Sequence, residues 1–297
     1  MSVVEFQNIH RAYKKGVPVL EGFNLSLEPG EVVGLLGRNG AGKTTLMRIA
    51  MGMLEPQQGG VRVFGIEPRQ NPIEVKQRVG YVAEDQVLPE FLRVEDVIGL
   101  HRELFPRWDS DLERELRETF DVPLRSKIKE LSKGQARQVA LLCAIAHRPE
   151  LLLLDEPAGG LDPAIRREFL ETAIQYLTQS GSTILFSSHH MGDVERLADR
   201  IVILDRGRVL IDESLDELRE GFSLVLLPLD IESRASELLE LEECLTIRKR
   251  PESFHAVFRA DCSRARSLLA DRFQIGNAKC RTIPLEEMFI ELMGRRK

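Results

Sequence analysis

Residues 37–45, Gly-Arg-Asn-Gly-Ala-Gly-Lys-Thr-Thr, constrain the fold of this chain more than any other segment. The apolar residues 32–36 before them have the composition of a buried strand, and residues 46–50 after them that of a helix. Strand, Gly-x-x-x-x-Gly-Lys-Thr and helix in this order predict a loop whose backbone N–H groups surround a phosphate. Lys43 would reach the terminal phosphates, and the Thr44 hydroxyl would bind Mg²⁺. A glycine-rich turn that only begins a helix is the alternative, but strand, spacing, Lys and Thr together disfavour it.

A second segment, residues 151–157, reads Leu-Leu-Leu-Leu-Asp-Glu-Pro. A continuous apolar run of this kind predicts a strand that is buried on both faces in a parallel sheet. Carboxylates at the carboxyl end of such a strand lie where α/β sheets bind ligands. We therefore expect Asp155 to hold Mg²⁺ and Glu156 to orient or deprotonate an attacking water. Two acids that merely cap the next element are the alternative, which is less consistent with a preceding phosphate loop.

Three further residues have both a functional and a structural interpretation. Tyr13 could stack on a nucleobase, although an isolated tyrosine is more often part of a core or its rim. Ser132 is a good N-cap for the helix that continues through residues 139–145, which by itself indicates only a capped helix. His189 follows the buried strand at residues 182–188 and could contact a γ-phosphate, although a solvated loop is the commoner setting.

The composition limits the classes of function. The 297 residues allow roughly two domains, and the net charge of −6 gives no sign of nucleic-acid binding. The four cysteines form no Cys-x-x-Cys pair, so we expect reduced thiols rather than a metal site or disulfides. The first residues lack the pattern of a signal peptide, and the apolar runs fall short of the ~20 residues of a spanning helix. We expect a cytoplasmic protein that would serve a membrane from outside the bilayer.

Taken together, the motifs resemble the nucleotide-binding subunit of an ABC transporter, across about residues 3–220. The resemblance rests on residues 37–45, on Leu-Ser-Lys-Gly-Gln at 131–135, on 151–156, on Gly-Leu-Asp at 160–162 and on His189, which occur in the order of an ATP-binding cassette. It implies a head-to-tail dimer, of identical or different ATPase subunits, with two ATP molecules between them. Ser132 and Gly134 of one subunit would then face the γ-phosphate held by Lys43 of the other, as a helix N-terminus favours an anion.

The resemblance also assigns roles to the remaining residues, and it makes Tyr13 the adenine-stacking aromatic. The residues expected to contact ATP are Tyr13, Gly37, Arg38, Asn39, Gly40, Ala41, Gly42, Lys43, Thr44, Thr45, Ser132, Lys133, Gly134, Gln135 and Asp162. The residues expected to hold Mg²⁺ are Thr44, Glu84 and Asp155, and those expected to act in catalysis are Glu156 and His189.

Two positions depart from the family pattern. Lys133 stands where the family usually has a second glycine, and it is tolerable if Ser132 and Gly134 make the phosphate contacts. Glu84 stands where the family usually has glutamine after the Gly-Tyr strand, and it still offers an oxygen to Mg²⁺ or water. Gln86 is close by, but it comes two residues too late.

The predicted fold class is α/β, a phosphate-loop ATPase cassette followed by a small lobe. The cassette, residues 1–220, would have a mostly parallel core sheet, an N-terminal antiparallel part and a helical insert at about residues 86–147. The lobe, residues 221–297, shows the order βαββαβ, which is typical of a ferredoxin-like α+β unit. Accessory strands that extend the first domain are the alternative. An amphipathic helix at residues 284–292 ends the pattern and resembles the end of cassettes that work with ABC-2-type export permeases.

The expected function is therefore an ATPase subunit that energises a separately encoded transmembrane permease from the cytoplasmic face of the membrane, and the resemblance implies export. Its cofactors would be ATP and Mg²⁺, and no nucleic acid is expected as a partner. The alternative is a soluble ABC-type ATPase that acts on a macromolecular partner outside transport. Ribosome-associated types generally carry two cassettes in one chain, whereas this chain has one. DNA-repair types carry long coiled coils or zinc modules, and the sequence shows neither.

Overall fold

The computed structural model describes residues 1–14, 16–85, 88–157, 159–178, 181–276 and 278–294. The chain divides into two compact units, Met1–Asp212 and Glu213–Lys297, called here the N-terminal and the C-terminal unit. This division lies just before the helix α8 (Leu215–Glu220). The domain boundary predicted from the sequence, between residues 220 and 221, lies just after that helix.

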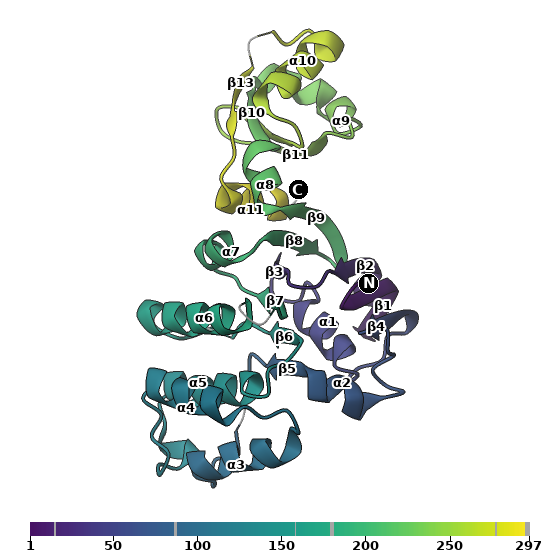
Figure 1. The fold of residues 1–297 in the computed structure, drawn as a ribbon. Helices are drawn as coiled ribbons and strands as arrows, with labels where there is room; N and C mark the ends of the chain where they lie inside the picture. The colour runs from purple at the N-terminus through teal and green to yellow at the C-terminus, as the bar shows by residue number, and fades with distance from the viewer. Residues whose placement is uncertain (15, 86–87, 158, 179–180, 277, 295–297) are drawn as a thin grey trace. The chain divides into compact units, whose positions relative to one another are not determined.

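A three-stranded antiparallel sheet begins the N-terminal unit, as predicted (Figure 1). Its strands, in the order β2-β1-β4, are β2 (Val17–Leu27), β1 (Val4–Lys14) and β4 (Gln58–Val63). Apolar residues alternate along β1, so that Val4, Phe6 and Ile9 are buried. Phe6 packs edge to face on Phe23 of β2, with ring centroids 5.8 Å apart. One face of this sheet therefore contributes to the core.

A six-stranded sheet forms the centre of the N-terminal unit, in the order β5-β6-β7-β3-β8-β9. The strands are β5 (Val79–Val82), β6 (Leu151–Leu154), β7 (Thr183–Ser187), β3 (Val32–Gly37), β8 (Arg200–Asp205) and β9 (Arg208–Ser214). The pairs from β5 to β8 are all parallel, which confirms the mostly parallel sheet. Every residue of β3, β6 and β7 is buried, because helices and the antiparallel sheet cover this sheet. The carboxyl ends of β3, β6 and β7 consequently meet at one edge.

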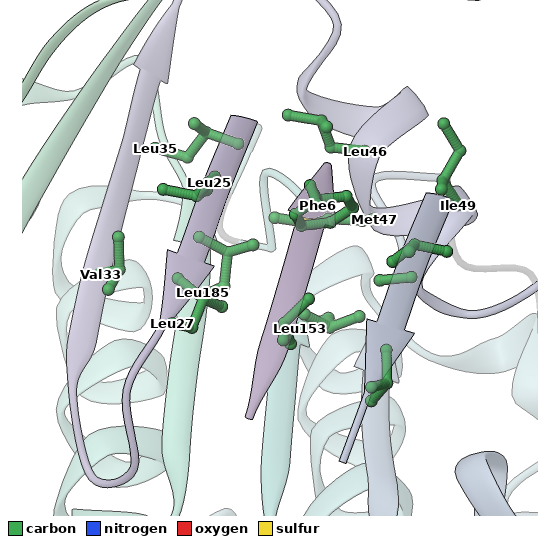
Figure 2. Packing of buried hydrophobic residues seen from close by; sticks show 14 of the residues in the cluster. Phe6, Leu25, Leu27, Val33, Leu35, Leu46, Met47, Ile49, Leu153 and Leu185 are labelled. Carbon is green, nitrogen blue, oxygen red and sulfur yellow. The ribbon is translucent and has the colours of Figure 1, made fainter. Parts of the chain in front are cut away.

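One hydrophobic cluster joins the two sheets to the helix α1 (Lys43–Ala50). Figure 2 shows side chains from both sheets and this helix together, among them Phe6, Leu25, Leu35, Met47 and Leu153. Further helices of the unit are α2 (Pro72–Arg78), α6 (Pro163–Thr178) and α7 (Met191–Leu197). The cluster fixes α1 behind β3, so the loop between them is held at both ends.

The predicted helical insert contains α3 (Val94–Leu104), α4 (Ser110–Thr119), the 3₁₀ turn Ile128–Glu130 and α5 (Lys133–Ile145). The Asp109 carboxylate caps α4 by accepting from the N–H groups of Asp111 and Leu112, each at 2.9 Å. The face of α4 predicted from its i, i+4 spacing is buried, with Leu112, Leu116 and Phe120 at most 5% exposed. In Figure 1 these helices lie together next to β5.

The C-terminal unit follows the predicted βαββαβ order. Its elements after α8 are β10 (Ser223–Leu227), a 3₁₀ turn (Leu229–Arg234), α9 (Ala235–Leu238), β11 (Cys244–Lys249), β12 (Phe254–Phe258), α10 (Cys262–Phe273), β13 (Lys279–Thr282) and α11 (Leu285–Met293). The strands form an antiparallel sheet in the order β11-β12-β10-β13, with its own apolar core, as in the ferredoxin-like arrangement.

The cysteines correct one expectation from the sequence. Cys262, at the start of α10, and Cys280, on β13, form a disulfide with their Cα atoms 5.5 Å apart. The expectation that all four cysteines are reduced is wrong for this pair, because the fold of the C-terminal unit brings together residues that have no Cys-x-x-Cys spacing. Cys143 and Cys244 are free and buried, and burial raises the pKa of the Cys244 thiol to about 12.

Candidate nucleotide site

The loop at residues 37–45 lies at the carboxyl end of β3 and begins α1. Gly40 and Gly42 have φ angles of 82° and 112°, which L-residues with a side chain rarely adopt. A Cβ atom on Gly42 would also lie 2.7 Å from Leu20 Cδ2, so this position requires glycine. Lys43 is 6% exposed, and its Nζ donates to the Gly37 carbonyl at 2.7 Å. The loop therefore bends back over its own lysine, as a phosphate-binding loop does.

A cavity of about 390 Å³ opens at this loop. Its lining joins the loop to three predicted residues from elsewhere in the N-terminal unit, namely Tyr13, Glu84 and Glu156. Residues 38–45 and Val19 complete the lining. Three stretches far apart in the sequence thus meet at the loop, as the predictions for a nucleotide site require.

Asp155 follows β6 and is fully buried. Its Oδ1 accepts a hydrogen bond from the Ser187 hydroxyl at 3.1 Å. Burial raises the pKa of Asp155, and hydrogen bonds from the Thr44 and Ser187 hydroxyls oppose that rise. Within the part of the chain that the structure describes, Oδ2 has no hydrogen-bond partner. A buried carboxylate oxygen without a partner next to a threonine hydroxyl fits a cation ligand better than a structural acid.

Glu156 lies between a lysine and a histidine. Its Oε1 is 3.4 Å from Lys43 Nζ, and its Oε2 is 2.8 Å from His189 Nδ1. Its backbone has a φ of 45°, a left-handed conformation that costs a non-glycine residue roughly 1–2 kcal/mol. The Glu156 N–H donates to Ser187 Oγ at 2.8 Å, which helps to hold this conformation. Backbone strain of this kind is concentrated at functional sites.

Tyr13 is 56% exposed at the rim of the cavity. Its hydroxyl is 3.2 Å from Thr45 Oγ1, and the Arg11 guanidinium lies 5.4 Å from the ring centroid. Tyr13 is therefore not a core residue, and its exposed ring can offer a surface to a base, so base stacking stays a prediction beside the alternative of a rim aromatic.

Two residues of the site were not singled out by sequence reasoning. Ser187, the last residue of β7, contacts both Asp155 and the Glu156 backbone. The signal for it is weak: a serine at the carboxyl end of a buried strand that neighbours the Asp-Glu strand. Arg137 donates to the carbonyls of Glu84 and Pro157, each at 2.6 Å. Its position one turn after the Ser132 cap is the only hint in the sequence.

Comparison with known proteins decides the family. The family model described as ABC transporter matches residues 20–159. The ABC transporter ATP-binding protein YtrB of Bacillus subtilis is 31% identical over 77% of this chain and 77% of its own. The chain belongs to the ATP-binding proteins of ABC transporters. A solved ATP-binding subunit of an ABC transporter is 31% identical, with a TM-score of 0.67, and the alignment covers 73% of this chain and 92% of that one.

Another solved cassette, MJ0796, was captured as a dimer in a post-hydrolysis state with ADP and phosphate. It is 24% identical to this chain, with a TM-score of 0.64 over 71% of this chain and 98% of that one, and it shows a shared fold. As a member of the family, the chain is the ATPase subunit of an ABC transporter. Residues 37–45 and the pair Asp155 and Glu156 lie within the residues that match the family model.

Residues 131–135, called here the signature segment, do not line the cavity of their own chain. Ser132 caps α5 by accepting from the Gln135 N–H at 3.2 Å, and Gln135 Oε1 accepts from the Ser132 N–H at 3.0 Å. Asp162 caps α6 by accepting from the N–H groups of Ala164 and Ile165 at 3.0 and 3.1 Å. The nucleotide contacts expected of Ser132, Lys133, Gly134, Gln135 and Asp162 therefore remain predictions.

The metal ligands expected from the sequence have different settings. The Thr44 hydroxyl lies beside the Asp155 carboxylate, whereas Glu84 is exposed at the rim of the cavity. The neighbouring Gln86 lies outside the described residues. No group of three or more His, Cys, Asp or Glu side chains that could hold a metal occurs among the residues described. Mg²⁺ would therefore need phosphate oxygens besides Thr44 and Asp155, as is usual for this ion.

Proposed function

We propose that Glu156 is the general base for ATP hydrolysis and that His189 holds it in place. The observation that carries this proposal is the position of the Glu156 carboxylate, between Lys43 at 3.4 Å and His189 at 2.8 Å. A base must lie within hydrogen-bond reach of the water that it activates, and Lys43 marks where the terminal phosphate binds. The strained backbone of Glu156 keeps its side chain directed into the cavity.

The residues that would hold Mg²⁺ are Thr44 and Asp155, with Glu84 at the rim. When bound, Mg²⁺ would neutralise charge that develops on the phosphates. Lys43 and the N–H groups of residues 38–45 would bind the phosphates, and Tyr13 would stack on the adenine.

The subunit would work as a head-to-tail dimer, with itself or with a second ATPase subunit. The position of the signature segment supports this dimer, since Ser132 and Gly134 do not line the cavity of their own chain. The dimeric MJ0796 cassette supports the same arrangement. In such a dimer, the N-terminus of α5 would face the γ-phosphate of the other subunit, as the helix dipole favours.

The transport partner would be a separately encoded permease, and the transport direction would be export. The helical insert carries three exposed apolar side chains suited to contact it: Phe91, Leu100 and Leu104 are 77%, 46% and 59% exposed. The neighbouring Leu92 is half-buried, so Phe91 is the better candidate for this contact. The subunit would then lie at the cytoplasmic face of the membrane through the permease. Among the described residues, no helix is sufficiently long and apolar to span a bilayer.

The variant Glu156→Gln tests the catalytic proposal. It keeps the shape of the side chain but cannot accept a proton, so turnover should fall on the order of 10²-fold or more while ATP binding remains. Light scattering in saturating ATP and Mg²⁺ should then show a dimer. Turnover near that of the wild type would remove Glu156 from the role, and a protein that stays monomeric would contradict the dimer.

The permease contact can be tested by cross-linking from cysteine variants in native membranes. Phe91→Cys should cross-link to a membrane protein. Ile73→Cys on α2, where the native side chain is 72% exposed, is a matched control. Cross-links to a membrane protein from residue 73 but never from residue 91 would contradict docking on the insert.

A further inference from the structure

Arg137 connects three segments of the N-terminal unit through one guanidinium group. It lies on α5, one turn after the Ser132 cap. Its Nη2 donates to the Glu84 carbonyl at 2.6 Å, and its Nη1 donates to the Pro157 carbonyl at 2.6 Å. A longer contact of 3.4 Å joins Nη1 to the Glu156 carbonyl. All three acceptors are backbone oxygens, so these contacts fix the course of the chain rather than a second side chain.

The three segments are those that the reaction has to coordinate. Glu84 follows β5 and leads into the helical insert, while Glu156 and Pro157 follow β6 and carry the proposed base. The helix α5 carries the signature segment. Arg137 thus joins the segment proposed to act on the partner's nucleotide to the base that acts on the subunit's own.

The chemistry of arginine suits this position. A planar guanidinium directs several N–H groups in fixed directions, so one side chain can hold carbonyls on separate loops at once. A lysine ammonium would supply a point charge but not this fork. Burial lowers the pKa of Arg137, while the charges of Glu84 and Asp85 raise it. The guanidinium has therefore lost part of its hydration in exchange for these carbonyls.

Glu156 depends on such support more than an ordinary residue does. Its φ of 45° lies in the left-handed region, where a non-glycine residue persists only if its surroundings hold it there. Ser187 holds its N–H, and Arg137 holds the peptide that follows, through the carbonyls of Glu156 and Pro157. The two contacts fix the backbone on either side of the Glu156 side chain.

We propose that Arg137 is a positioning residue for ATP hydrolysis, which holds Glu156 in its left-handed conformation and ties it to α5 and to the Glu84 segment. This inference rests on the proposed role of Glu156 as the base. Arg137 does not line the nucleotide cavity. Its loss should therefore lower kcat and leave the affinity for ATP almost unchanged, because a small displacement of a base strongly slows a reaction.

The test compares Arg137→Gln, Arg137→Lys and Arg114→Gln in the full chain. Arg114 is an exposed arginine of the same insert that pairs with Asp111, so its variant matches the change in charge. For Arg137→Gln we expect kcat to fall about 10-fold or more, with the ATP dissociation constant from calorimetry within about twofold of the wild type. The kcat of Arg137→Lys should lie between those of Arg137→Gln and the wild type, and the kcat of Arg114→Gln should equal that of the wild type.

Two results would overturn the inference: an unchanged kcat in Arg137→Gln, or a fall in kcat with an equal loss of ATP affinity. If Arg137→Gln does not fold, as circular dichroism would show, Arg137→Lys decides by the same criteria. Glu156→Gln, measured in parallel, separates the two proposals. A fully active Glu156→Gln refutes the role of Glu156, whereas an inactive Glu156→Gln beside a fully active Arg137→Gln refutes only the role of Arg137.

Discussion

Each unit of the molecule buries a glutamate beside basic side chains, and the two sites differ in the number of carboxylates that share those side chains. In the N-terminal unit, Glu156 is 8% exposed, with Lys43 and His189 against it. In the C-terminal unit, Glu291 of α11 is 2% exposed. Its Oε1 is 2.7 Å from Arg250 Nη2 and 3.0 Å from His255 Nδ1, and its Oε2 is 3.6 Å from Arg248 Nε.

The balance of charge separates a structural carboxylate from a reactive one. Two arginines surround the single carboxylate of Glu291, which lies within a regular helix. At the nucleotide site two carboxylates, Asp155 and Glu156, share one lysine, and Glu156 has a strained backbone. An excess of buried carboxylate is stable only if a cation or a proton joins it. The first arrangement therefore fastens α11 to its sheet, while the second suits Mg²⁺ and proton transfer.

Removing one cation from each setting should give the largest contrast. Lys43→Ala removes the charged contact with the phosphates, so ATP affinity should fall on the order of 10²-fold, by calorimetry. Arg250→Ala, which removes a basic partner of Glu291 in the same way, should leave ATP affinity unaltered. Tight ATP binding by Lys43→Ala would break the comparison, since the lysine would then serve Glu156 rather than the nucleotide.

Glu291→Gln tests the opposite half of the comparison. It removes the carboxylate that contacts Arg248 and Arg250, so the free energy of unfolding should fall by about 2 kcal/mol, less than for a fully buried pair because Arg250 is partly exposed. Urea unfolding followed by circular dichroism measures this, and ATP turnover serves as the control that should not change. A stable protein with impaired turnover would show that Glu291 is more than structural.

His147 extends the comparison to a buried base. It is 1% exposed and stacks on Phe105, with ring centroids 4.0 Å apart. Burial, aided by the charge of His101, lowers the pKa of His147 to about 4. Because protonation is harder in the folded state, stability should be complete above pH 6.5 and fall as the pH decreases toward 4. At pH 5 the loss is about 2 kcal/mol relative to pH 7.

The measurement for His147 is the urea midpoint at pH 7 and pH 5, in the wild type and in His147→Asn. The variant cannot gain this proton, so its stability should depend less on pH than that of the wild type. An equal dependence in both proteins would assign the acid effect to carboxylates elsewhere.

The smallest effect is expected from removing residues 221–297, which make up most of the C-terminal unit. A chain shortened after Glu220 keeps every residue that we place at the nucleotide site, so its turnover should stay within about twofold of the full chain. Steady-state ATPase assays at high protein concentration measure this. A folded, ATP-binding fragment without hydrolysis would mean that the C-terminal unit contributes to the catalytic assembly.

Features with local causes could be predicted from the sequence. The glycine spacing at residues 37–45 determines a loop by backbone rules alone, and the apolar run before Asp155 determines a buried strand. Strand and helix periodicity also gave the βαββαβ order of the C-terminal unit. These patterns depend on neighbouring residues, so they can be recognised without the fold.

Contacts that depend on the packing of distant segments could not be predicted. Ser187 reaches Asp155 because β7 pairs with β6, and no residue spacing in the sequence predicts that these two strands are neighbours. Arg137 and the Cys262–Cys280 disulfide likewise act across segments that only the folded units bring together. The left-handed backbone of Glu156 could not be predicted either, since a glutamate in the sequence does not indicate a positive φ.

The strand order of the central sheet has one more consequence, which concerns side-chain length. Because β7 lies between β3 and β6, the phosphate loop and the acids stand two strands apart, roughly 10 Å at the usual strand spacing. Lys43 and Glu156 are long enough to meet across this gap at 3.4 Å, while the shorter Asp155 accepts from Ser187 on the strand between and from the Thr44 hydroxyl of the loop. The strand spacing therefore sets the side-chain length that the Lys43–Glu156 contact requires, and an aspartate at position 156 would place its carboxylate one methylene farther from Lys43.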